Sequence, residues 1–300
     1  MEAGLQTPDS GAGGGGAVRA PWAKPAGIAF FDHAGYPLAY RETGKGEPLI
    51  LIHGSMSDYR SWMLQIPAFS AKYRTIALSL RHSYPEAWNG KGAYSVGLHA
   101  DDTAAFIRGM GLKSAHIVGH SRGGAVAMVL ALRYPDLVKS LILAEPAGLE
   151  GLLPDTPEGK RMAAESAAQF AKLARDVAAG DMVKAAREFV DSLGGPGAWE
   201  KRMPEARQVL LDNIGTGPAC AERPYFTRDE IAGIKSPTLL LTGERSPPRY
   251  RASMTDMQAC NKAKILPLVT IPGAAHSMQR DNPDAFDAEV LKFLAAQGRG

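Results

Sequence analysis

The sequence has little cysteine, no long apolar run and no cluster of charges of one sign. Its two cysteines, Cys220 and Cys260, lie far apart in the chain. Free thiols in a reducing cytosol and a single disulfide both fit this pair, and free thiols are the simpler expectation. No apolar run approaches the roughly 20 residues of a membrane-spanning helix. Acidic and basic residues are interspersed, with a formal net charge of +3, which excludes the clustered basic footprint of a nucleic-acid-binding protein.

The N-terminal segment offers few side chains for burial. Residues 1–27 are rich in Gly and Ala, which predicts a flexible tail. The segment lacks a basic stretch followed by an apolar stretch, so it does not match a secretory signal, and we expect a cytoplasmic protein. The chain has no Cys-x-x-Cys pair, and we expect neither a metal nor a cofactor.

Apolar runs that suit buried strands alternate with helical segments from residue 28 onward. The predicted strands are Pro48–Ile52, Arg74–Leu80, a short run with Ala115, Ile117 and Val118 that leads into Gly119, Val138–Ala144, Pro237–Thr242 and Leu268–Ile271, preceded by an edge hairpin of Ile28–Phe31 and Leu38–Arg41. Helices are expected at Leu98–Gly111, directly after residue 121 and at Pro283–Gln297. This alternation predicts an α/β fold, in which helices cover both faces of a mostly parallel sheet.

A segment of different composition interrupts this series at residues 148–234. It is rich in Ala, Glu, Lys, Arg and Met and contains no strand-like run. One helical face carries Met182, Val183, Ala186, Phe189, Val190 and Leu193. We expect three or four amphipathic helices that form a lid, or cap, over a core made of residues 28–147 and 235–300. A lid is favoured over an independent helical excursion because open α/β sheets bind ligands at the carboxyl ends of their strands.

The most informative motif is Gly119-His-Ser-Arg-Gly123, between a predicted strand and an alanine-rich helix. The G-x-S-x-G pattern suits a sharp turn where backbone crosses backbone closely, and Ser121 stands at its apex. The turn places the hydroxyl at a helix N-terminus, where free N–H groups stabilise negative charge. A serine that only caps the helix would have the same local pattern. A nucleophile also requires a base, an acid and oxyanion donors.

Two further loops supply candidates for the base and for the oxyanion donors. His276 lies just past the last predicted strand, where a loop can fold back over the sheet edge, and is the candidate base. The loop after Pro48–Ile52 reads His-Gly-Ser-Met. Its position suits an oxyanion hole made by the backbone N–H of Ser55, or of Met56, together with that of Arg122.

Taken together, the three motifs resemble the α/β-hydrolase family over about residues 28 to 297. The matching pieces are His53-Gly54, Gly119–Gly123 and Pro272–His276, in this order along the chain. The resemblance implies an eight-stranded, mostly parallel sheet whose first two strands are antiparallel at one edge. It also implies that Ser121 is the nucleophile and that His276 is its base.

The position of the acid departs from the family pattern. Family members usually carry it a few residues after the strand that ends at Thr242, and this chain has Ser246 there. A serine cannot orient an imidazole by charge, so Glu145 and Glu244 are the candidates. Glu145 is favoured because the order Ser121, Glu145, His276 keeps the chain order of this fold. Glu244 is close to the usual position and stays open as the alternative acid.

The loop after Arg74–Leu80 also departs from the family, because it is bulky and aromatic. We expect an apolar acyl pocket lined by Met56, Tyr59, Trp62, Tyr84 and Trp88, with ordinary packing around the entrance as the alternative for each. Arg245 and Arg249 stand near the expected cleft edge and could meet an acidic substrate. Arginines in a polar loop are, however, usually solvated.

The sequence therefore predicts a serine hydrolase that acts on a small-molecule ester or lactone through an acyl-enzyme. Two alternatives stay open: a C–C bond hydrolase, and a non-catalytic, receptor-like ligand-binding protein. The second is motivated by Ser246 at the usual acid position. A serine nucleophile disfavours epoxide hydrolase and haloalkane dehalogenase chemistry, because both use a carboxylate nucleophile in this fold. No pattern in the chain predicts its oligomeric state.

Overall fold

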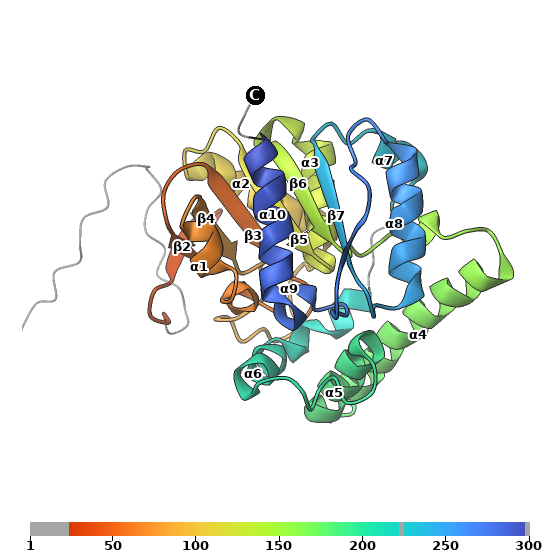
Figure 1. Ribbon diagram of the computed structural model, residues 1–300. Coiled ribbons are helices and arrows are strands. Elements are labelled where there is room, and N and C mark those ends of the chain that lie inside the picture. Colours follow the sequence, from red (N-terminus) through yellow and green to blue (C-terminus); the bar gives the residue numbers. More distant parts are fainter. Residues whose placement is uncertain (1–23, 222–224, 298–300) are drawn as a thin grey trace, which may run out of the picture.

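A single eight-stranded sheet organises the molecule (Figure 1). The computed structural model describes residues 24–221 and 225–297, so most of the expected tail at 1–27 lies outside the described residues. The strands are β1 (Ala29–His33), β2 (Tyr36–Thr43), β3 (Pro48–Ile52), β4 (Arg74–Leu78), β5 (Ala115–His120), β6 (Val138–Ala144), β7 (Thr238–Gly243) and β8 (Val269–Ile271). Their order across the sheet is β1-β2-β4-β3-β5-β6-β7-β8.

The sheet is mostly parallel, as predicted. Strand β2 is antiparallel to both β1 and β4, and every pair from β4 to β8 is parallel. Strands β3 and β6 have the bounds of their predicted runs. Strand β3 is apolar throughout, and β6 carries Lys139 and Ser140 ahead of the buried apolar residues 141–144. Strand β4 ends at Leu78, two residues before the end of its predicted run, although the next residue, Ser79, still donates its N–H to Ala39 on β2.

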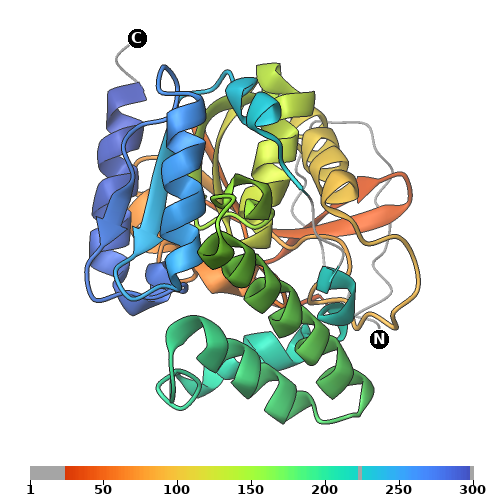
Figure 2. The ribbon, with the colours of Figure 1, turned by 90° about the vertical axis from the view of Figure 1, so that its right-hand side faces the viewer.

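Helices cover both faces of the sheet (Figures 1 and 2). They are α1 (Ile66–Ser70), α2 (Val96–Gly109), α3 (Arg122–Arg133), α4 (Pro157–Ala178), α5 (Met182–Gly194), α6 (Pro204–Asp212), α7 (Arg228–Ala232), α8 (Pro248–Cys260), α9 (Met278–Asp281) and α10 (Pro283–Gln297). Helices α2, α3 and α8 pack on one face, and α1 and α10 pack on the other. Among residues 24–221 and 225–297, the structure contains no helix with the length and apolarity needed to cross a membrane.

Local sequence signals define where the longer helices begin. The Ser95 side chain accepts the Leu98 N–H at the start of α2, and Thr156 caps α4 in the same way. Pro157 then occupies the first turn of α4, where a missing N–H costs nothing. Cys220 and Cys260 are both free thiols, as favoured from the sequence.

The segment between β6 and β7 contributes three helices at the carboxyl end of the sheet. Helices α4, α5 and α6 lie there together (Figures 1 and 2) and share an apolar cluster that includes Phe189 and Val190. Of the predicted apolar stripe, Met182 and Val183 are exposed. Helix α7 lies at the opposite end of the sheet, where Ile231 joins the core, so only the earlier part of residues 148–234 extends over the carboxyl edge.

The fold predicts that one side chain of α10 is essential for stability. Phe286 is fully buried between α10 and the sheet, with its ring 6.3 Å from that of Trp62. We expect Phe286→Ala to lower the free energy of unfolding by about 3–5 kcal/mol, measured by urea denaturation. The control is Lys292→Ala on the same helix, whose side chain is 77% exposed and pairs only with Glu289. A loss below about 1 kcal/mol at Phe286 would contradict this packing.

Candidate active site

Ser121 stands on a sharp turn between β5 and α3. Its backbone has φ 54° and ψ −120°, and residues other than Gly rarely adopt a positive φ. The flanking glycines permit the turn. A Cβ on Gly119 would lie 2.5 Å from the carbonyl oxygen of Gly123, and one on Gly123 would lie 2.2 Å from that of Ile52. The motif has small residues at these two positions because the backbone leaves no room for side chains.

His276 and Glu145 form a buried pair at the same edge of the sheet. Glu145 follows β6 directly, and its Oε2 lies 2.6 Å from Nδ1 of His276. Both residues are almost completely buried, with exposed fractions of 0% for Glu145 and 4% for His276. The carboxylate accepts at this distance, so Nδ1 carries the hydrogen and Nε2 is left as the basic nitrogen of the neutral ring.

The second carboxylate oxygen of Glu145 is held by the neighbouring strand. Oε1 accepts hydrogen bonds from Oγ1 of Thr242 at 2.6 Å and from the N–H of Gly243 at 2.9 Å, both on β7. Burial raises the pKa of Glu145, but the hydrogen bond and charge of His276 outweigh burial and bring the pKa below the usual 4.5. Glu145 is therefore an ionised, fixed partner of the imidazole at neutral pH.

The alternative carboxylate, Glu244, faces a different group. It is exposed, and its Oε2 accepts the backbone N–H of Gly273 at 2.7 Å. This contact ties the end of β7 to the turn before His276 without reaching the imidazole. Ser246 stays close to the end of β7, since a Cβ on Gly243 would lie 2.7 Å from the Ser246 hydroxyl.

Two rings and one hydrogen bond position the imidazole of His276. Tyr250 stacks on it at a centroid distance of 4.7 Å and an angle of 15°, and His120 packs against it at 4.7 Å and 44°. Nε2 of His120 donates to the His276 carbonyl at 2.7 Å. Burial lowers the pKa of His120 well below 6.5, so this residue stays neutral and serves as a support.

The loop after β3 approaches the nucleophile closely. A Cβ on Gly54 would lie 3.1 Å from Cβ of Ser121. His53 shapes this loop: its Nε2 accepts the N–H of Leu80 at 2.9 Å, and its Nδ1 donates to the Gly54 carbonyl at 2.8 Å. Burial lowers the pKa of His53 to about 4, which keeps the ring neutral in both contacts.

Backbone donors face the space beside Ser121. No hydrogen-bond acceptor within the described part of the chain takes the backbone N–H of Ser55 or of Arg122. Ser55 lines the cavity at Ser121, whereas the Met56 side chain is buried in the apolar cluster of α4, α5 and α6. The N–H of Arg122 is the first of α3, so no residue of the helix can accept it.

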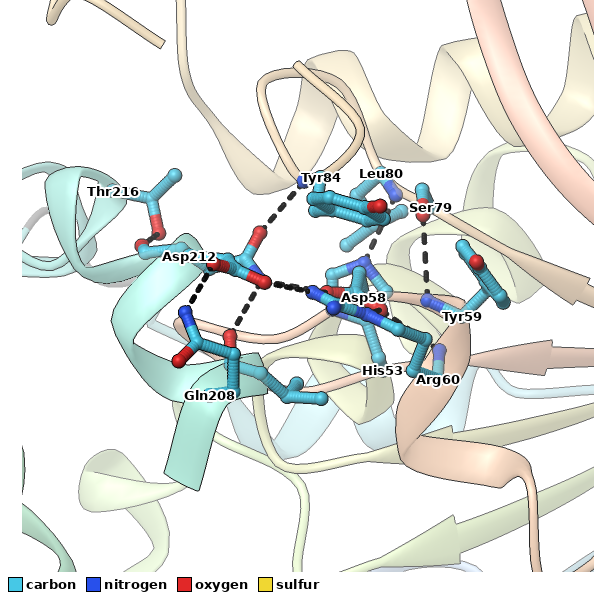
Figure 3. A network of polar contacts seen from close by, with 12 residues as sticks. His53, Asp58, Tyr59, Arg60, Ser79, Leu80, Tyr84, Gln208, Asp212 and Thr216 are labelled. Atoms are coloured by element: carbon cyan, nitrogen blue, oxygen red, sulfur yellow. Dashed lines mark hydrogen bonds and ion pairs between the residues drawn. The ribbon is translucent and has the colours of Figure 1, made fainter. Parts of the chain in front are cut away.

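A polar network ties the helices over the carboxyl edge to this loop (Figure 3). Asp58 is fully buried and accepts from Arg60 and from the side-chain amide of Asn213, each at 2.7 Å. Arg60 also pairs with Asp212 at the end of α6, at 2.8 Å. Asn213 in turn accepts the N–H of Tyr84 at 2.7 Å. The network fixes the end of α6 against the loops that follow β3 and β4.

A cavity of about 60 Å³ opens at Ser121 and His276. Its opposite wall is apolar and comes from α5 and α6, through Phe189, Val190, Leu193, Val209 and Leu210. Three of them, Phe189, Val190 and Leu193, belong to the apolar stripe predicted from the sequence, so the sequence indicated this part of the wall. The cavity therefore forms where the inserted helices meet the carboxyl edge of the sheet.

The five residues expected to line an acyl pocket lie elsewhere. None of Met56, Tyr59, Trp62, Tyr84 and Trp88 lines the cavity at Ser121. Trp62 packs on Phe286 in the core, Tyr84 lies beside Tyr59 with ring centroids 6.4 Å apart, and Trp88 stacks on His82 at 4.7 Å. These aromatic side chains gain more burial by packing against the core and one another than by facing the cavity.

Two arginines that sequence reasoning missed line the cavity instead. Arg202 precedes α6 and Arg280 lies on α9, and both also line a second, outer cavity of about 200 Å³ that shares His276. Of the two arginines noted from the sequence, Arg245 lines the outer cavity, and Arg249 donates to Gln169 of α4. No local sequence pattern distinguishes Arg202 or Arg280 from a surface arginine, because their burial depends on helices far apart in the chain.

Behind the turn, the side chain of Arg122 points into a buried aromatic cluster. Its guanidinium lies over the ring of Tyr94, at 4.4 Å from the centroid. His99 packs edge-on against the same Tyr94 ring at 4.8 Å, and neither of its nitrogens has a hydrogen-bond partner in the described part of the chain. Burial, aided by the charge of Arg122, lowers the pKa of His99 well below 6.5.

Comparisons with known proteins agree with this architecture. The model of the alpha/beta hydrolase family matches residues 49–289. An (E)-2-((N-methylformamido)methylene)succinate hydrolase of Acinetobacter baylyi is 27% identical over 262 residues, which cover 85% of this chain and 93% of that protein. Epoxide hydrolase 3 of Xenopus tropicalis is 27% identical over 270 residues, covering 83% and 72%. A thermophilic esterase from Thermogutta terrifontis has a TM-score of 0.71 at 26% identity, covering 92% of this chain and 99% of that one.

The burial of His99 predicts how stability depends on pH. Because its pKa is lower in the folded chain than the unfolded value of 6.5, the unfolded chain binds more protons as the pH falls. Stability from this group is complete above pH 6.5 and is lost below it. We expect the wild type to lose about 2 kcal/mol more unfolding free energy between pH 7 and pH 5 than His99→Leu, measured by urea denaturation. Equal losses in the two proteins would contradict a neutral, buried His99.

Proposed function

Because this chain belongs to the alpha/beta hydrolase family, we propose that it is a serine hydrolase that cleaves a carboxylic ester or a lactone. The observation that carries the proposal is the 2.6 Å contact between His276 and Glu145, in a buried site whose cavity is also lined by Ser121. A buried carboxylate is costly unless it is paired, so the contact with Glu145 distinguishes His276 from a histidine in a solvated surface loop. The esterase of Thermogutta terrifontis supports this class of substrate.

In the proposed reaction, Ser121 attacks the carbonyl carbon and His276 Nε2 takes the hydroxyl proton. Glu145 keeps the hydrogen of the imidazole on Nδ1 and stabilises the imidazolium that forms. The tetrahedral intermediate collapses, the leaving alcohol takes the proton from His276, and an ester of Ser121 remains. His276 then takes a proton from water as the water oxygen attacks the acyl-enzyme. The second tetrahedral intermediate collapses, Oγ of Ser121 takes this proton from His276, and the acid is released.

The developing oxyanion needs donors that are in place before the reaction. We assign this role to the backbone N–H groups of Ser55 and Arg122, which have no acceptor among the described residues and flank Ser121. The positive end of α3 adds to the same field. Each such donor contributes about 3 kcal/mol to transition-state stabilisation.

The remaining features define what surrounds the reaction. We propose that α4, α5 and α6 form a lid over a core made of residues 28–147 and 235–300, with α7 belonging to the core.

Epoxide opening, the activity named for one relative, is disfavoured because Ser121 replaces the carboxylate nucleophile of that chemistry. The free thiols of Cys220 and Cys260 suit the reducing cytoplasm in which we place the protein.

A fluorophosphonate probe tests whether Ser121 is an activated nucleophile. We expect the purified protein to form a covalent adduct on the peptide that contains Ser121, located by mass spectrometry, because the base and oxyanion donors activate the hydroxyl. The Ser121→Ala variant should fold and show no adduct. Absence of an adduct on the folded wild type would contradict the proposal and favour a receptor-like ligand-binding role.

Exchange of carboxylates distinguishes the two candidate acids. We expect Glu145→Gln to lower kcat/KM on a p-nitrophenyl ester by about 10⁴-fold, because a neutral partner no longer selects the Nδ1–H tautomer. Glu244→Gln is the matched control and should stay within about threefold, since an amide oxygen can still accept the Gly273 N–H. The reverse pattern in steady-state kinetics would make Glu244 the acid.

A further inference from the structure

Positive charge dominates the space in front of His276. The outer cavity is lined by four cationic side chains, Lys201, Arg202, Arg245 and Arg280, against one acidic residue, Asp281. Arg202 and Arg280 alone among these also line the inner cavity at Ser121. A molecule that reaches the nucleophile through the outer cavity therefore passes both guanidinium groups.

The two inner arginines lack an anionic partner. No carboxylate oxygen of a described residue lies within ion-pair distance of either guanidinium, and Arg202 donates a hydrogen bond to the Ser277 hydroxyl at 2.7 Å. Asp281, which follows Arg280 in the sequence, accepts the backbone N–H of Ala275 at 2.8 Å. That contact helps to shape the loop before His276. The charge of Asp281 favours both cations, as do those of Asp191 for Arg202 and Asp58 for Arg280, but burial outweighs these attractions.

Nearby carboxylates on other elements are engaged as well. Asp58 is held by Arg60 and Asn213, and Asp191 accepts the N–H of Trp199 at 2.8 Å. Burial lowers the pKa of Arg280 to about 10, and the charge of Arg202 adds to this effect. Burial also lowers the pKa of Arg202. Two desolvated cations close enough to repel each other are costly unless an anion joins them.

We propose that the substrate carries a carboxylate besides its scissile ester or lactone bond, and that Arg202 and Arg280 bind this carboxylate. The inference rests on the proposed function, because it places the reacting carbonyl at Ser121. A guanidinium donates two parallel hydrogen bonds to a carboxylate, so the pair supplies geometry as well as charge. The apolar wall from α5 and α6 would then cover the carbon chain between the two ends of the substrate.

Matched pairs of esters test the preference for charge. The anionic set consists of the monoethyl esters of succinic, glutaric and adipic acid, and each is compared with the neutral ethyl ester of a monocarboxylic acid of equal chain length. Acid release is followed by pH-stat. We expect the best anionic ester to have a kcat/KM about 10-fold or more above that of its neutral partner. Equal values for every pair would overturn the proposal.

Variants then assign the preference to the two arginines. Arg202→Gln and Arg280→Gln should each lower kcat/KM for the anionic ester by about 10- to 100-fold, mainly through KM, and change that of the neutral ester by less than about threefold. The corresponding Lys variants should recover part of the loss. Arg187→Gln is the charge-matched control, because Arg187 is exposed on α5 and pairs with Glu200 outside both cavities. Equal losses on the anionic and neutral esters would indicate a structural role and overturn the proposal.

A binding experiment separates this inference from the proposed function. The Ser121→Ala protein is titrated calorimetrically with the monoethyl esters, which it cannot turn over. Binding of the anionic ester that weakens about 10-fold or more on adding Arg202→Gln or Arg280→Gln supports the carboxylate site even if the wild type shows no turnover. Binding unchanged by either substitution overturns the site, while adduct formation on Ser121 would leave the serine hydrolase proposal standing.

Discussion

Backbone packing around Ser121 is the constraint on which the rest of the site depends. Gly119 and Gly123 bring β5, α3 and the end of β3 so close that any side chain at either position would overlap a carbonyl oxygen. This contact holds the serine at the start of α3 and brings the loop after β3 beside it. Because the neighbouring strands are parallel, the same edge also receives the residues that follow β6 and β8. The elbow therefore determines where every other functional group must lie.

Backbone strain is concentrated at this edge. Five described residues other than Gly have a positive φ, and each follows a strand: Ala34 after β1, Met56 after β3, His82 after β4, Ser121 after β5 and Glu145 after β6. Each such conformation costs about 1–3 kcal/mol and persists only where the surroundings enforce it. At Glu145 the enforcing contacts are the hydrogen bonds to Thr242 and Gly243, which turn the carboxylate toward His276. At Ser121 and Glu145, the strained backbone accompanies the side chains that form the site, whereas Met56 and His82 pack elsewhere.

The sequence predicts the scaffold well and the cavity poorly, for a physical reason. Strands such as β3 and β6 follow from local apolar runs, and the preference for Glu145 as a candidate follows from its place at the end of β6. The walls of the cavity depend on how α5 and α6 pack on the edge, which no local pattern determines. Trp62 was expected at the cavity because it is aromatic, yet it packs against Phe286, since composition does not reveal which face a loop residue takes. The burial of Arg202 and Arg280 has the same long-range origin.

Charge compensation within the site is uneven, and this unevenness bears on specificity. The negative charge of Glu145 is taken up by His276, Thr242 and Gly243 on one side of the imidazole. On the other side, Arg202 and Arg280 keep their charge next to His120 and lower the pKa of this buried histidine further. An anionic substrate would offset both cations when it binds, so the two guanidinium groups bear on which substrates the site accepts, while Glu145 orients the base for every substrate.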